Sequence, residues 1–155
     1  NKWLGDKPWD VIHFNFGLHD LKYLGPKGQN LADPKGEGSH QQVQITDYEK
    51  NLRAMVVRLE KTGAELVWRT TTPVPPGARG RVVGDSVKYN QAAAKIMKER
   101  KVAIDDMYTF CMPRLKEIMR PANVHFTPAG SRALAGRAVA AINAALKRRA
   151  PSSEK

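Results

Sequence analysis

Short apolar runs alternate with longer segments of helical periodicity, and this alternation limits the chain to a small set of folds. The runs cover residues 11–16, 65–70 and 102–104, and they are rich in β-branched and aromatic residues. Runs of this kind are typical of buried strands in a parallel sheet. The order strand, helix, strand, helix, strand, helix, helix predicts an α/β domain in which right-handed crossovers connect parallel strands.

The first two predicted helices have clear apolar faces. Thr46 and Glu49 form a capping-box pattern, and the face behind it consists of Tyr48, Leu52, Met55, Val56 and Leu59. Asp85 or Ser86 is the expected N-cap of the second helix. Its shared face consists of Tyr89, Ala92, Ala93, Ile96 and Met97. Both segments therefore predict amphipathic helices that pack on the sheet.

Two helices are predicted after the third strand. A short one lies around 114–119, before Pro121. The last helix follows Thr127, which can cap it, and Pro128, which suits its first turn. Its apolar stripe consists of Leu134, Ala138, Ile142 and Leu146. Residues 25–40, which are rich in Gly, Pro and charge, predict a long loop, and such loops are usually functional or disordered.

The length of 155 residues fits one domain. We assign residues 1–150 to that domain and 151–155 to a disordered tail. The chain contains no apolar run near the roughly 18 residues that span a bilayer and no leader-like start, so we expect no membrane contact. Cys111 is the single cysteine, which excludes an internal disulfide framework. These features leave the cellular location open.

The net charge of +11 raises the question of an anionic partner. The basic residues are scattered along the sequence, and only 147–149 form a run, at the end of the last predicted helix. Cations in a last turn suit the helix dipole. We therefore expect a solvated basic surface that binds nucleic acid only non-specifically.

Two polar clusters lie beside predicted strands and helices. Gly17, His19 and Asp20 come directly after the first strand, and His125 lies just before the last helix. Open α/β sheets place their ligands beyond the carboxyl ends of the strands. The simpler interpretation is a turn at Gly17 with Asp20 as a cap, and a structural hydrogen-bonding role for His125. The topology nevertheless predicts that His125 lies close to 17–20.

The two clusters resemble conserved blocks of the SGNH or GDSL hydrolases. F-N-F-G-L-H-D resembles the block G-x-N-D, and N-V-H-F-T-P-A-G resembles the block D-x-x-H before the C-terminal helix. The T-T-T-P-V-P loop and the third strand lie between them in the expected order. The resemblance covers nearly the whole chain. It implies a flavodoxin-like three-layer α/β/α sandwich that hydrolyses small-molecule esters without a metal or cofactor.

The resemblance also implies roles for the four residues. His125 would be the general base that takes the proton of a serine nucleophile, and His19 stands where the family has an oxyanion-binding asparagine. A neutral imidazole N–H can donate to an oxyanion, so this role is compatible with His19. Gly17 would permit the turn, and Asp20 would be a structural hydrogen-bonding carboxylate.

The sequence departs from the family pattern in two further places. The nucleophile block, the oxyanion glycine block and the first two strands of the sheet lie upstream of the G-x-N-D block and are not in this sequence. Ala122 occupies the position of the carboxylate that usually orients the histidine. Asn123 can orient an imidazole through its amide, although it is one position off.

Gly84-Asp85-Ser86 spells the nucleophile motif of the family, but no apolar strand precedes it. We interpret Ser86 as a helix cap, which leaves the nucleophile unassigned. An ester hydrolase is the favoured prediction. A non-catalytic binding domain on the same fold and a basic polyanion-binding protein are the alternatives. The missing neighbours of the first strand also predict a homo-oligomer that forms through an exposed edge.

Overall fold

The computed structural model describes residues 4–5 and 8–149, so the predicted tail 151–155 lies outside the described residues. The centre of the fold is a parallel sheet with the order β1-β4-β5. Its strands are β1 (Val11–Phe14), β4 (Glu65–Arg69) and β5 (Ala103–Asp105). The predicted parallel sheet is confirmed, and among the described residues β1 is an edge strand.

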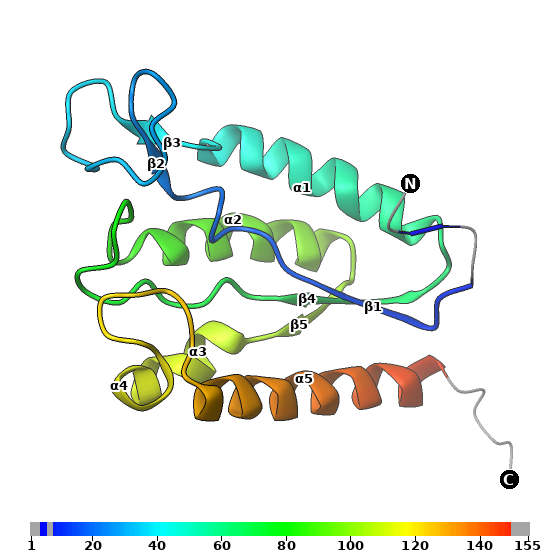
Figure 1. Ribbon diagram of the computed structural model, residues 1–155. Helices are drawn as coiled ribbons and strands as arrows, with labels where there is room; N and C mark the ends of the chain where they lie inside the picture. The colour runs from blue at the N-terminus through cyan, green and yellow to red at the C-terminus, as the bar shows by residue number, and fades with distance from the viewer. Residues whose placement is uncertain (1–3, 6–7, 150–155) are drawn as a thin grey trace, which may run out of the picture.

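Helices cover both faces of this sheet and give three layers (Figure 1). The helices α1 (Ile45–Glu60) and α2 (Asp85–Glu99) lie on one face, and α5 (Pro128–Arg149) packs on β4 and β1 from the other. Three short helices connect β5 to α5. They are α3 (Met107–Cys111), the 3₁₀ helix η1 (Met112–Arg114) and α4 (Leu115–Ile118). The predicted α/β/α sandwich is therefore confirmed.

The main core lies between the sheet and the α1–α2 layer. Leu66 and Trp68 on β4 belong to this core, and they alternate with Val67 and Arg69 as the pleat of a strand requires. The predicted faces of the two helices are buried here, with Met55 half-buried. Burial of these side chains holds the helices on the sheet.

The start of α1 differs from the prediction. The amide of Tyr48 donates to the carbonyl of Gln44 at 2.8 Å, so Gln44 is the N-cap and no side chain caps the helix. Thr46 then lies inside the first turn, where it cannot form a capping box with Glu49. The prediction of a capping box is wrong because the helix begins one residue before Thr46.

The start of α2 also differs, whereas that of α5 is as predicted. Gly84, with φ of +93°, is the N-cap of α2, and no side-chain hydrogen bond caps this helix. The proposed caps Asp85 and Ser86 therefore lie within the first turn and are buried. At α5 the hydroxyl of Thr127 accepts from the amide of Gly130 at 3.0 Å, so the Thr127 cap is confirmed.

The long loop is closed at its base rather than structureless. The short strands β2 (Tyr23–Leu24) and β3 (His40–Gln41) pair antiparallel at the two ends of the loop. The loop also packs against the segment after β4, because a Cβ atom on Gly80 would collide with the backbone of Leu31. Gly80 has φ of +63°, which suits glycine. The prediction of a long loop did not include this short sheet.

A second apolar cluster lies between the short helices and α5. It consists of Met107, Cys111, Ile118, Met119 and Leu134. The side chain of Cys111 is fully buried, and burial raises the pKa of its thiol to about 11. The sequence predicted α4 but missed α3, whose five residues are too few for helical periodicity to be visible.

A buried carboxylate connects all three strands to α5. Asp105 at the end of β5 is paired with His13 of β1 at 3.1 Å, with Arg69 of β4 at 3.2 Å and with Arg137 of α5 at 3.0 Å. Its side chain is only 1% exposed. Satisfied polar groups at this depth fix the register of the elements that provide them.

Three connections meet beyond the carboxyl ends of the strands, on the left in Figure 1. They are the segment after β1, the segment 70–84 after β4 and the loop before α5. This is the end of the sheet at which the sequence predicted a site. Within the described residues, no helix combines the length and apolar character needed to cross a bilayer.

Candidate functional site

The carboxyl end of β1 is fixed by hydrogen bonds to one carbonyl. The Phe16 carbonyl accepts from the hydroxyl of Tyr48 at 3.0 Å and from that of Thr71 at 2.9 Å. Gly17 follows with φ of +142°, and a Cβ atom there would collide with the Thr71 hydroxyl. Only glycine therefore fits between Phe16 and the turn, because both the space and the backbone angle exclude other residues.

The turn after Gly17 carries the first polar cluster. It is closed by a hydrogen bond from the Leu21 amide to the Gly17 carbonyl at 2.9 Å, and Leu21 is fully buried. His19 is exposed at the tip. Asp20 is half-buried, and its main-chain carbonyl accepts from the amide of Val43. Among the described residues the Asp20 carboxylate makes no hydrogen bond. The main chain of Asp20, not its side chain, therefore joins this turn to Val43.

His125 lies on a tight loop that connects α4 to α5. The ends of the loop are joined by a bridge between Met119 and Phe126, and the Arg120 amide donates to the His125 carbonyl at 2.9 Å. Ala122 at the tip has φ of +49°, a backbone angle that L residues adopt rarely. These contacts hold the His125 side chain at an exposed position beside the start of α5.

Asn123 is the hydrogen-bond partner of the His125 ring. Its side-chain oxygen lies 2.7 Å from His125 Nδ1 and also accepts from the His125 main-chain amide at 2.9 Å. An amide oxygen can only accept, so the Nδ1 atom carries the proton in this contact. The Nε2 atom of a neutral ring is then unprotonated and can accept a proton from another group.

Two adjoining cavities bring the clusters together. His19 and His125 line the same cavity of about 190 Å³, together with Leu18, Lys22, Asn30, Leu31, Arg81 and Val124. The second cavity, of about 120 Å³, shares Leu31, Arg81, Val124 and His125 with the first. The structure therefore brings His125 close to His19, whereas Gly17 and Asp20 support the turn without lining either cavity.

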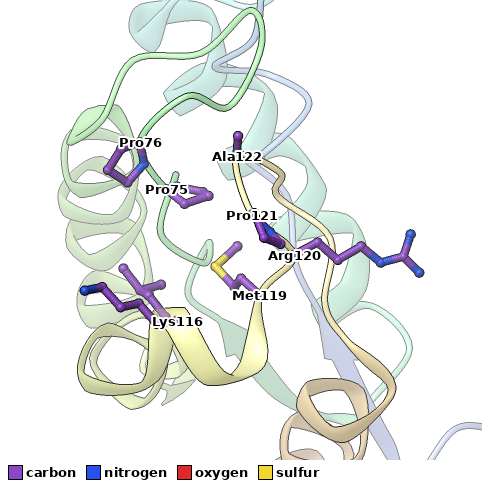
Figure 2. A pocket seen from close by; sticks show the side chains of 8 residues that line it. Pro75, Pro76, Lys116, Met119, Arg120, Pro121 and Ala122 are labelled. Carbon is purple, nitrogen blue, oxygen red and sulfur yellow. The ribbon is translucent and has the colours of Figure 1, made fainter.

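A larger apolar cavity lies on the other side of Ala122, which lines both it and the second cavity. Its volume is about 460 Å³, within the range of small-molecule sites. Figure 2 shows Pro75, Pro76, Met119, Pro121 and Ala122 around the hollow, with the guanidinium of Arg120 pointing away from it. The lining suits a hydrocarbon group because it offers few polar atoms.

Among the described residues, no hydroxyl or thiol side chain lines the two cavities that contain His125. Neither lining includes Ser, Thr, Tyr or Cys. Ser86 is fully buried in α2, and its hydroxyl has no hydrogen-bond partner among the described residues. The described part of the chain thus offers a histidine oriented by an amide, without a nucleophile beside it.

The sequence interpretation gave no role at the site to Arg79, Arg81 and Leu31. Arg79 and Arg81 belong to the sequence G-A-R-G-R after β4, and Leu31 belongs to the long loop. The two glycines of that sequence were a signal of close backbone approach. The partner of Gly80, which is the Leu31 backbone, could not be read from the sequence because the two lie 49 positions apart.

Comparison with known proteins gives one family match. The model of the GDSL-like lipase/acylhydrolase family matches residues 2–133, which is most of the chain. No curated protein matches the sequence.

Several solved structures share the fold. A lipase/acylhydrolase from Enterococcus faecalis superposes with a TM-score of 0.65 at 16% identity, over 90% of this chain and 63% of that protein. An alpha/beta hydrolase enzyme from the metagenome of Lake Arreo, Spain, gives 0.67 at 18% identity, over 90% and 64%. An acetyl xylan esterase from Geobacillus stearothermophilus gives 0.65 at 17% identity, over 90% and 63%. The chain therefore spans less than two thirds of the length of these three proteins.

Proposed function

Because the chain belongs to the GDSL-like lipase/acylhydrolase family, we propose that its function is the hydrolysis of carboxylic esters. The observation that carries this proposal is the cavity shared by His19 and His125, with Asn123 bound to the Nδ1 atom of His125. A histidine whose Nε2 atom is free can act as a general base. The imidazole N–H of His19, which lines the same cavity, can donate to an oxyanion.

The proposed reaction divides the chemistry among these groups. A serine hydroxyl attacks the ester carbonyl while His125 Nε2 takes its proton, and His19 donates to the oxygen that becomes negative. The intermediate collapses, and the alcohol leaves with the proton from His125. Water then attacks the acylated serine while His125 takes a proton from the water. The serine leaves with that proton, and the acid is released. Gly17 is the residue that permits the turn on which His19 lies.

The serine in this scheme has to be brought to the cavities that contain His125, because none of the described residues that line them carries a hydroxyl. The two sources compatible with the fold are a segment that pairs with the free edge of β1 and a neighbouring copy of the chain. When no such segment is present, we propose that the neighbouring copy provides the serine. A homo-oligomer is then part of the functional form.

We further propose that the 460 Å³ cavity receives the apolar part of the ester. It adjoins the His125 loop at Ala122, so a substrate in the second cavity can extend into it. Filling it with an Ala122→Trp substitution is expected to reduce hydrolysis of p-nitrophenyl octanoate more than hydrolysis of p-nitrophenyl acetate. Equal losses for both esters would contradict this assignment.

Hydrolysis of p-nitrophenyl acetate by the chain and by His125→Ala tests the function. A general base contributes about 10² to 10⁴ in rate, so the variant is expected to lose at least about 100-fold. Lys95→Ala, an exposed substitution on α2, is the control and is expected to keep the full rate. Equal rates for the chain and His125→Ala would end the proposal.

The second candidate is a non-catalytic binding domain on the same fold. The observation that favours it is the absence of a hydroxyl side chain from the lining of both cavities. It predicts that the folded chain binds a product acid but never labels with a fluorophosphonate and never turns over an ester. Covalent labelling, followed by mass spectrometry of the modified peptide, distinguishes the two functions.

A further inference from the structure

Three cations line the cavities that contain His125. Lys22 lines the cavity shared with His19, Arg79 lines the second cavity, and Arg81 lines both. Neither lining contains an aspartate or a glutamate. The proposed site is therefore positive, and no acidic side chain in its walls balances the charge.

Several basic residues outside these cavities form ion pairs with carboxylates: Arg53, Arg69, Lys88, Arg100, Arg137, Arg148 and Arg149. Within the described residues, Lys22, Arg79 and Arg81 form no such pair. Their charge is thus available to a bound anion.

Arg81 is positioned by the main chain. Its Nε atom donates to the Leu18 carbonyl at 3.1 Å and one Nη atom donates to the Arg79 carbonyl at 3.5 Å. The side chain is half-buried, and this desolvation lowers the pKa of the guanidinium. Partial removal of a charge from water without a counter-charge is unfavourable. A bound anion would relieve that cost.

The backbone around Arg81 is also fixed. Gly80 fits against the Leu31 backbone, and its carbonyl accepts from the Tyr23 amide at 2.8 Å. These contacts join the segment after β4 to the long loop, and they place Arg81 between the two histidine-bearing turns. The guanidinium is therefore held in place before any ligand binds, which reduces the entropy lost on binding.

We propose that Arg81, with Arg79 and Lys22, forms a subsite for an anionic group on the substrate, such as a carboxylate, at a position separate from the reacting ester. This inference rests on the proposed function for its placement beside a reacting ester. The planar fork of Arg81 suits a carboxylate, and Arg79 and Lys22 add charge at the more open sides. The preferred substrate class is accordingly an ester that carries a negative charge.

Binding of benzoate and of neutral benzamide tests the subsite without requiring turnover. These probes have similar shape and differ in charge. Titrations followed by the ring-proton resonances of His19 and His125 are expected to give a dissociation constant at least about tenfold lower for benzoate, as charge-assisted hydrogen bonds imply. Equal dissociation constants would overturn the proposal.

Matched variants separate the local effect from net charge. Arg79→Gln and Arg81→Gln are each expected to weaken benzoate binding about fivefold or more and to leave benzamide binding unchanged. Arg81→Lys is expected to restore part of the loss. Arg53→Gln removes the same charge from an exposed position on α1 and is expected to change nothing. If Arg81→Gln fails to fold, the exposed Arg79 carries the test.

A polyanion is the competing occupant. Tight binding of duplex DNA, lost steeply with salt and unaccompanied by benzoate binding, would contradict a small-anion subsite. Equal losses of benzoate binding in Arg79→Gln and Arg53→Gln would do the same, because they would indicate attraction by net charge alone.

Turnover of two esters separates this inference from the proposed function. If 4-acetoxybenzamide is hydrolysed and 4-acetoxybenzoate is not preferred, the subsite is wrong and the hydrolase stands. If neither ester is hydrolysed while benzoate binds through Arg79 and Arg81, the subsite stands and the hydrolase is wrong. Preference for 4-acetoxybenzoate that disappears in Arg79→Gln supports both.

Discussion

At the scale of single residues, the proposed base depends on one amide oxygen. Asn123 accepts from both the ring and the main chain of His125, so it selects the tautomer with the proton on Nδ1. An aspartate at position 123 would place a negative charge at the same point. Because an adjacent carboxylate favours the imidazolium form, Asn123→Asp is expected to stabilise the imidazolium that forms when His125 takes a proton.

The histidine Cε1–H resonances at pH 7 measure this change, because they differ between the neutral and the protonated ring. His19, which lines the same cavity from a different loop, is the internal control, and its resonance is expected to stay the same. An unchanged His125 resonance in Asn123→Asp would show that the contact between these two residues does not persist in solution.

Ser86 gives a second prediction at this scale. Its hydroxyl is fully buried and has no hydrogen-bond partner among the described residues. Removal of an unsatisfied buried hydroxyl is nearly neutral or stabilising, so Ser86→Ala is expected to change the free energy of unfolding by less than about 1 kcal/mol, towards stabilisation.

Urea unfolding of Ser86→Ala measures the change. Any esterase activity per folded molecule is expected to stay the same, because Ser86 lines neither cavity with His125. A folded variant that lost all activity, or fluorophosphonate labelling of Ser86 itself, would indicate that Ser86 is the nucleophile.

The sequence predicted that His125 and His19 would be neighbours, and it offered Asn123 as a residue that can orient the His125 ring. The neighbours followed from topology, since both residues come at the carboxyl side of a parallel sheet. The contact of Asn123 did not follow from the family pattern, because Asn123 stands one position from the family carboxylate. The left-handed backbone of Ala122 turns the loop so that the side chain two positions before His125 reaches the ring, and a residue pattern does not encode that turn.

At the scale of elements, Asp105 holds the sheet and α5 together. Its carboxylate contacts one residue from each of β1, β4 and α5. Asp105→Asn would leave two guanidinium groups without their partner, although Arg137 is 40% exposed and can be partly hydrated. The expected loss is about 2–3 kcal/mol in the free energy of unfolding, below the full cost of breaking a buried pair.

Denaturant unfolding at pH 7 measures this loss. Glu65→Gln, which removes the carboxylate of the half-exposed pair with Arg148, is the matched control and is expected to cost less than about 1 kcal/mol. Similar losses in both variants would show that burial of Asp105 adds nothing to the stability that its ion pairs provide.

His13 makes the stability of this arrangement depend on pH. Burial lowers the pKa of His13 from its ordinary value of 6.5, against the opposing effect of the hydrogen bond that His13 donates to the Asp105 carboxylate. The unfolded chain therefore binds more protons than the folded chain as the pH falls below about 6.5. The free energy of unfolding is expected to decrease as the pH falls from 7 to 5.

Unfolding of His13→Gln across the same pH range tests this dependence. The variant is expected to show a flatter profile, because the group that takes up the proton on unfolding is gone. The carboxylates whose pKa is lowered, such as Glu60, titrate below this window and do not confuse the comparison. Parallel profiles of unfolding free energy against pH for the chain and the variant would contradict the assignment of this pH dependence to His13.

Element types were predictable, and element starts were less so. The faces of α1 and α2 followed from residues that recur at helical spacing, and burial of those faces decides where a helix packs. The caps at Thr46, Asp85 and Ser86 failed because a cap depends on one or two local hydrogen bonds. At α2, the positive φ of Gly84 began the helix without any side chain.

At the scale of the whole molecule, one edge of β1 pairs with no strand among the described residues, and this edge predicts self-association. Trp9 and Phe16, at the two ends of this strand, are 40% and 42% exposed. Unpaired backbone groups beside exposed aromatic rings are a surface on which another strand can add. Light scattering at micromolar concentration is expected to give at least twice the chain mass of 17.2 kDa.

Two substitutions to lysine locate the interface. Phe16→Lys is expected to shift the population towards the monomer, since a charge beside an edge strand opposes pairing. Val139→Lys, at a 56% exposed position on α5, is expected to leave the mass unchanged. A monodisperse species near 17.2 kDa for the unsubstituted chain would refute self-association.

The parallel sheet could be predicted, because it follows from the alternation of strands and helices and from the handedness of the connections. The contact between the long loop and the segment after β4 could not. It depends on the fit of Gly80 against Leu31, and the residues near that contact determine which side chains enter the two cavities. A charged subsite built by two loops is therefore visible only in three dimensions.

Cys111 makes the chain suitable for spectroscopic labelling without further engineering of its thiols. It is the single cysteine of the sequence, its side chain is fully buried, and the pKa of its thiol is raised to about 11. Maleimide dyes and nitroxide reagents attack the thiolate, so they should leave Cys111 unmodified at neutral pH. A cysteine introduced at Val139 would then carry the only label, and distances between labels on associated chains would report how two copies are oriented.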